Sequence, residues 1–197
     1  MHRRLPEPVA AWLRLLLPPL VYLALRWGTG RALALLRPPL ADAATLVLLP
    51  AVLWAHCRDS APRHTLQPTA ALPGILCGAG LGLLSGMFPA GAEAVASRSP
   101  IGLIALCLAG PLCEEAVYRG IVLRRARAML PVGAALSVSA ALFAAGHGTP
   151  ARMAAALIAG FVFGGVYLRG EESCPGAGLP AAALCHMTAN AVLLFYR

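Results

Sequence analysis

The chain has 197 residues, of which 59% are hydrophobic and only 12% are charged, and its formal net charge is +8. Soluble domains carry about a quarter charged residues, so this composition excludes an ordinary soluble domain and indicates an integral membrane protein. All of the basic charge comes from 16 arginines scattered among apolar segments, which disfavours nucleic-acid binding and favours contact with membrane lipids.

Seven apolar segments, separated by Arg, Pro and Gly residues, predict an all-α fold, a polytopic transmembrane bundle of about seven to eight helices. We expect one transmembrane domain over residues 1–197, with a motif-bearing core at about residues 100–197. A kink is expected in the first span, at Pro18 and Pro19. In chain order the expected spans are about Val9–Trp27, Leu40–His56, Ala70–Phe88, Ile101–Met129, Val132–His147, Ala151–Leu168 and Leu179–Tyr196.

The fourth segment, Ile101–Met129, is too long for one helix perpendicular to the membrane. It would reach roughly 43 Å, against a hydrocarbon core of about 30 Å. Gly110 and Pro111 predict a break, because proline suits the first turn of a new helix. Glu114 and Glu115 are then expected near the positive end of that second helix.

Glycines recur at every fourth position in the third span. One helix face therefore carries no side chain, and a neighbouring backbone can approach it closely. The same spacing of small residues occurs in the sixth span. Such a face can pack tightly against another helix or form a substrate groove, and packing is the favoured interpretation. The residues are Gly74, Gly78, Gly82 and Gly86 in the third span, and Ala156, Gly160 and Gly164 in the sixth.

Three apolar segments carry polar side chains four residues apart, so each pair lies on one helix face. Charges at membrane depth cost several kcal/mol and usually serve a function. Glu114 and His147 lie about equally far from an expected helical hairpin turn at Leu130 and Pro131, so they are expected to meet. The patterns are Glu114-Glu115-x-x-x-Arg119, Phe143-x-x-x-His147 and His186-x-x-x-Asn190.

The spacing separates the roles of the two glutamates. Glu115 can pair with Arg119 along its own helix, whereas Glu114 points roughly 100° away and has no partner on that helix. Glu114 is therefore the candidate general base, and Glu115 and Arg119 support it. His147 is expected to activate or hold a water molecule.

The third pattern completes a hydrolytic site, because His186 and Asn190 can donate hydrogen bonds to an oxyanion. His186 fits the geometry less well. It lies only seven or eight residues into its expected span, so its depth does not match that of His147 without tilt or a shifted boundary.

Three alternatives stay open at this point. Two histidines and one carboxylate can bind zinc, but no H-E-x-x-H pattern is present, and we predict no metal and no other cofactor. A non-proteolytic immunity or scaffold protein of the same fold would use Glu114 only for folding. A proton-coupled transporter would use it as a relay, but no inverted repeat is visible.

The three patterns, which follow one another at residues 114–119, 143–147 and 186–190, resemble those of the CPBP family. This family comprises the CAAX-protease and bacteriocin-processing (Abi) membrane proteins. The resemblance implies an intramembrane endopeptidase of the glutamic type. It implies that Glu114 and His147 activate the water, that His186 and Asn190 form the oxyanion site, and that Phe143 supports them. The implied substrate is a peptide or protein, with a hydrophobic C-terminal tail in the short bacterial members linked to sorting signals. The expected location is the bacterial inner (cytoplasmic) membrane.

Overall fold

The computed structural model describes residues 7–36, 43–60, 64–86 and 99–195. Within these ranges the chain forms seven helices and no strand, so the prediction of an all-α bundle is confirmed. The helices are α1 (Glu7–Leu36), α2 (Ala44–Ser60), α3 (Pro68–Gly86), a continuous helix comprising α5 (Pro100–Ile104), α6 (Gly110–Glu115) and α7 (Arg124–Arg127), α8 (Val132–Ala145), α9 (Pro150–Ser173) and α10 (Gly178–Phe195).

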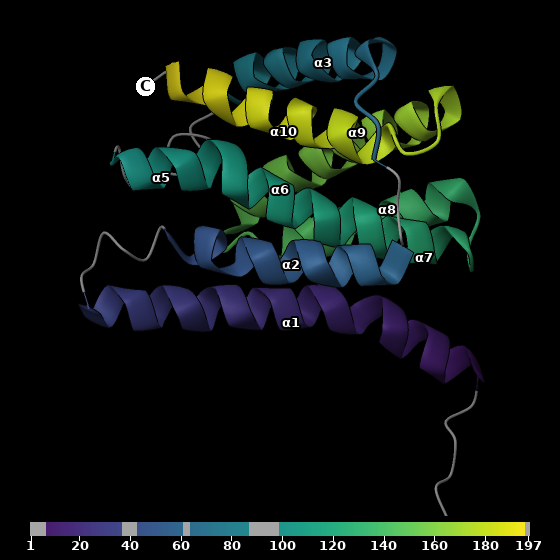
Figure 1. Ribbon diagram of the computed structural model, residues 1–197, viewed down its shortest axis with the longest axis horizontal. Coiled ribbons are helices and arrows are strands. Elements are labelled where there is room, and N and C mark those ends of the chain that lie inside the picture. Colours follow the sequence, from purple (N-terminus) through teal and green to yellow (C-terminus); the bar gives the residue numbers. More distant parts are fainter. Residues whose placement is uncertain (1–6, 37–42, 61–63, 87–98, 196–197) are drawn as a thin grey trace, which may run out of the picture.

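The continuous helix from α5 to α7 lies at the centre of the bundle, with α3 and α10 on one side of it and α1 and α2 on the other (Figure 1). Burial agrees with this position, because 61% of its apolar stretch is buried, against 17% in α1. Two π-helical turns, Ala105–Ala109 and Ala116–Leu123, interrupt this helix. Figure 1 also shows α1 bending away from the rest of the bundle towards its N-terminal end, and two prolines, Pro18 and Pro19, lie inside this helix.

The outer surface of the bundle is apolar. Five helices are long and apolar enough to cross a membrane, and large hydrophobic side chains on them are exposed, for example Leu17 at 58% and Leu76 at 63%. Such a surface is stable against lipid acyl chains and unfavourable in water. The chain is therefore an integral membrane protein.

The predicted helix break at Gly110 and Pro111 is wrong, because one helix runs from Pro100 to Arg127. In the π-helical turn the amide of Gly110 donates to the carbonyl of Ala105, five residues back. In this register the carbonyl of Leu106 would accept from residue 111, but a proline has no amide hydrogen. Asn190 of α10 supplies the missing donor, with Nδ2 at 2.8 Å from the Leu106 oxygen. The proline is thus accommodated without ending the helix.

The expected position of Glu114 and Glu115 near the start of a helix is also wrong. Glu114 and Glu115 lie in the middle of the continuous helix, so the positive end of a helix dipole does not act on them. The first span is also longer than expected, since α1 continues past Trp27 to Leu36.

The glycine faces pack helix against helix. A Cβ atom on Gly78 would lie 2.1 Å from the carbonyl oxygen of Cys185, and one on Gly74 would lie 2.6 Å from that of Ala181. Both contacts bring the backbones of α3 and α10 together. In α9, Gly160 makes the same kind of contact with Ala140 of α8. Close helix packing, the favoured interpretation of the pattern, accounts for these glycines.

The close approach of Gly78 to Cys185 can be tested by substitution. Gly78→Ala is expected to destabilise the protein by about 1–3 kcal/mol, because the added methyl group forces α3 away from α10. Gly80→Ala is the matched control, since a Cβ atom there meets nothing within 4 Å. Thermal unfolding in detergent measures both variants. Equal melting temperatures for Gly78→Ala and the wild type would contradict the packing.

Candidate active site

Glu115 is the centre of a buried polar network. Its Oε1 accepts from Arg119 Nη1 at 3.0 Å and from His186 Nδ1 at 2.9 Å. Arg119 also donates through Nη2 to the carbonyl of Gly160 in α9, at 2.9 Å. Glu115 and Arg119 are fully buried, so these bonds act in surroundings of low dielectric constant. The predicted i, i+4 pair therefore forms, and it also ties the central helix to α9 and α10.

The same network orients His186. Because a carboxylate only accepts, Nδ1 of His186 must carry the hydrogen that faces Glu115. The opposite nitrogen, Nε2, lies 3.8 Å from Oε2 of Glu114. The ring of Phe163 stacks on the imidazole, with centroids 4.3 Å apart and planes 19° apart. His186 is thus fixed by a carboxylate at one nitrogen and by an aromatic face.

The expected difference in depth between His186 and His147 does not keep the two side chains apart. Both line one cavity, and the ring of Phe143 contacts both imidazoles. The helix boundaries are shifted, because α8 ends at Ala145, before His147, and α10 begins at Gly178. Glu114 is residue 15 of the 28-residue helix Pro100–Arg127 and His186 is residue 9 of the 18-residue α10, so both lie near the midpoints of their helices.

Glu114 has a partner that the sequence did not suggest. Its Oε1 lies 2.6 Å from Nη1 of Arg26, which comes from α1. The expectation that Glu114 lacks a partner on its own helix is met, but the carboxylate is not alone. The Arg26 side chain is 41% exposed and that of Glu114 only 9%. The pair therefore joins a buried carboxylate to a guanidinium that opens onto a cavity.

His147 lies just after the end of α8, in the turn before α9. Its Nδ1 is 2.9 Å from the carbonyl oxygen of Phe143, so Nδ1 donates and a neutral ring leaves Nε2 as an acceptor. In this form the ring can accept a proton from a water molecule at Nε2.

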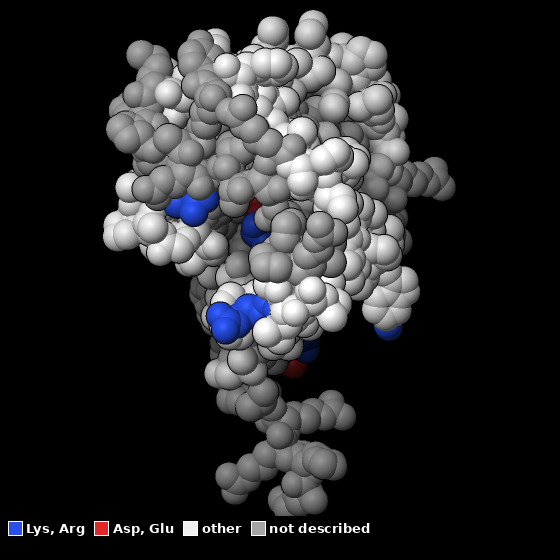
Figure 2. All heavy atoms as spheres, turned by 90° about the vertical axis from the view of Figure 1, so that its left-hand side faces the viewer, with Lys and Arg blue, Asp and Glu red and all other residues white. Residues whose placement is uncertain are grey.

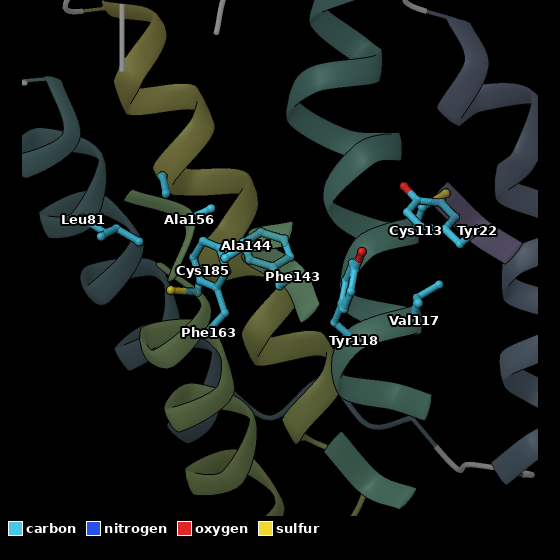
Figure 3. Close-up of a cluster of buried hydrophobic side chains, with 11 residues drawn as sticks. Tyr22, Leu81, Cys113, Val117, Tyr118, Phe143, Ala144, Ala156, Phe163 and Cys185 are labelled. Carbon is cyan, nitrogen blue, oxygen red and sulfur yellow. The ribbon is translucent and has the colours of Figure 1, made fainter. Parts of the chain in front are cut away.

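Phe143 connects the two histidines. Its ring centroid is 4.8 Å from that of His147 and 5.8 Å from that of His186, and the guanidinium carbon of Arg119 lies 4.8 Å above it. Figure 3 shows Phe143 between Phe163 and Tyr118, which contact it edge to face. The supporting role expected for Phe143 thus has a physical basis, since one ring positions three polar side chains.

A cavity of about 860 Å³ joins these residues. Glu114, His147, His186 and Asn190 all line it, so the structure brings together the four predicted catalytic side chains. Figure 2 looks onto the end of the bundle where residues of this cavity lie, and shows acidic and basic atoms inside a hollow. Asn190 donates one amide hydrogen to the carbonyl of Leu106, and its second amide hydrogen has no acceptor among the residues that the structure describes.

Sequence reasoning missed two residues of the site. Arg26 received no role because it lies next to the expected end of the first span, at Trp27; α1 continues to Leu36, and an arginine inside such an apolar helix would have been a signal. Phe163 carries no such signal, because an aromatic residue in an apolar span is ordinary. Its position between His186 and Arg119 follows only from the packing of α9.

Among the residues described, no group of three or more His, Cys, Asp or Glu side chains is arranged to hold a metal ion. The carboxylates of Glu114 and Glu115 are paired instead with Arg26, Arg119 and His186.

Comparison with known protein families identifies a related family. Residues 96–192 match the family model described as Type II CAAX prenyl endopeptidase Rce1-like. This range contains every predicted site residue, whereas Arg26 lies outside it. No curated protein sequence and no solved structure matches the chain.

Proposed function

We propose that this chain cleaves a peptide bond with a water molecule that Glu114 and His147 activate. Residues 96–192 belong to the Rce1-like family of type II CAAX prenyl endopeptidases. The family supports a general intramembrane endopeptidase function, which agrees with the resemblance to the CPBP proteins. The observation that carries the proposed mechanism is the convergence of Glu114, His147 and His186 on one cavity within a membrane bundle.

The proposed first step is attack of water on the scissile carbonyl carbon. Glu114, ionised and paired with Arg26, accepts the proton, and the neutral His147 holds or shares the attacking water. The carbonyl oxygen becomes an oxyanion. The second amide hydrogen of Asn190 is a suitable donor to it.

His186 is the other proposed oxyanion donor. Its Nδ1 already donates to Glu115, so donation from Nε2 requires a ring that carries hydrogens on both nitrogens. The tetrahedral intermediate then collapses, the C–N bond breaks, and the leaving amine takes up the proton from Glu114 or His147. Water is consumed and two peptide ends form, so no co-reactant is required.

The proposed substrate is a peptide or protein with a hydrophobic C-terminal tail, in the bacterial inner membrane. The site lies at the midpoint of membrane-length helices, so a lipid-embedded segment can reach it without leaving the apolar phase. The arginine-rich, lysine-free composition fits a membrane with anionic head groups.

Purified protein in proteoliposomes, incubated with such peptides and analysed by mass spectrometry, tests the function. A single new pair of peptide ends is expected, and a parallel ion-flux assay is expected to show no transport. Flux without cleavage would favour the transporter alternative. Binding of peptides with neither cleavage nor flux would favour an immunity or scaffold role.

A further inference from the structure

The described residues that line the cavity carry more positive than negative charge. Arg26, Arg31 and Arg152 line it, and Glu114 is the one carboxylate among its described lining residues. Glu114 pairs with Arg26, at 2.6 Å. Arg31 and Arg152 therefore face the cavity without a counter-ion among the lining residues that the structure describes.

The two arginines lie towards the ends of their helices. Arg31 follows Arg26 by five residues, about 7 Å further along α1, and its guanidinium carbon lies 5.1 Å over the ring of Trp27. Arg152 is in the first turn of α9, where its backbone amide donates to the capping hydroxyl of Thr149. Within the parts of the chain described by the structure, neither side chain has a carboxylate at ion-pair distance.

Two guanidinium groups that face a cavity without a described counter-ion are suited to bind a carboxylate. Arginine binds a carboxylate through two parallel N–H bonds, and such charge-assisted bonds are roughly twice as strong as neutral ones. Stacking on Trp27 limits the freedom of the Arg31 side chain, so less conformational entropy is lost when it binds. In Figure 2 basic atoms are visible both inside the hollow and beside it.

We propose that Arg31 and Arg152 form a subsite for a carboxylate of the peptide substrate, between the scissile bond and the opening of the cavity. This inference rests on the proposed function, because it names a feature of the substrate of the same site. The carboxylate can belong to the free C-terminus or to an acidic side chain. The arms of the experiment distinguish these two sources.

Three peptides with one cleavable sequence provide the test. The first ends in a free carboxylate, the second in an amide, and the third in an amide after an added glutamate. The wild type is expected to cleave the first or the third with at least about tenfold higher kcat/KM than the second, the size of one charge-assisted bond. A preference for the first identifies the chain end, and a preference for the third the side chain.

Substitutions of Arg31 and Arg152 test whether these two side chains cause the preference for the carboxylate peptide. Arg31→Gln and Arg152→Gln are each expected to reduce the preference to about twofold or less, because kcat/KM falls more for the carboxylate peptide than for the amide peptide. Arg58→Gln is the matched control, because Arg58 also stacks on a tryptophan, Trp54 at 4.8 Å, but does not line the cavity. Circular dichroism checks that each variant is folded.

The possible results distinguish a failure of the proposed subsite from a failure of the proposed endopeptidase function. Equal cleavage of all three peptides by the wild type would overturn the subsite and leave the endopeptidase function intact. Tighter binding of a carboxylate peptide in fluorescence anisotropy, with no cleavage, would support the subsite and overturn the function. If both variants slow all peptides equally, and only in vesicles containing phosphatidylglycerol, the arginines bind lipid phosphates and the subsite is wrong.

Discussion

Glu114→Gln is expected to abolish peptide cleavage, with kcat/KM at least about 10²- to 10⁴-fold below that of the wild type. The amide has nearly the shape of the carboxylate but cannot accept a proton from water. Glu114 lines the cavity with His147 and His186, and its Oε2 lies 3.8 Å from Nε2 of His186. If Glu114 is the base, the loss lies in kcat and not in binding.

Two further variants make this result specific. Glu172→Gln removes an exposed carboxylate at the end of α9, 70% exposed and outside the cavity, so its activity is expected to equal that of the wild type. Arg26→Gln removes the partner of Glu114 and tests whether the loss stems from the broken ion pair alone. Glu114→Gln with more than a tenth of wild-type kcat/KM, measured on folded protein, would remove Glu114 from the mechanism.

The second large effect concerns stability. Arg119→Leu is expected to destabilise the protein by about 3–5 kcal/mol, because it leaves the charge of Glu115 buried without its partner. The substitution also removes the bond to Gly160 and the contacts with the rings of Phe143 and Phe163. Unfolding of the protein in mixed micelles with increasing SDS measures the change.

A double variant separates the charge from the packing. Adding Glu115→Gln to Arg119→Leu is expected to recover part of the lost stability, because the uncompensated charge is gone. Arg169→Gln is the control, since Arg169 and Glu172 form an exposed pair of the same type, which contributes little. Wild-type stability of Arg119→Leu would show that the buried network does not hold the bundle together.

Much of the site could be predicted from short-range spacing. Glu115 and Arg119 are four residues apart on one helix, and this distance alone predicts their pair. Equal distances to the hairpin turn between α7 and α8 predicted that Glu114 and His147 lie at one level, and both side chains line the same cavity. Both arguments need only the regular geometry of a helix, which lipid surroundings enforce strongly.

The rest depended on contacts that no local pattern contains. The π-helical turn before Pro111 keeps the central helix continuous because Asn190, 84 residues away along the chain, donates to the carbonyl of Leu106. Likewise, Arg26 reaches Glu114 across 88 residues. In both cases a distant side chain compensates a local defect or charge, and single-sequence patterns do not contain that information.

An experimental structure of the protein in lipid nanodiscs, at a resolution that shows ordered water, tests directly whether Glu114 activates the attacking water. We expect the carboxylate of Glu114 within about 4 Å of the His186 ring, and a water molecule hydrogen-bonded to Glu114 and to Nε2 of His147. A Glu114 side chain directed at the acyl chains, with no water shared with either histidine, would contradict this role of Glu114.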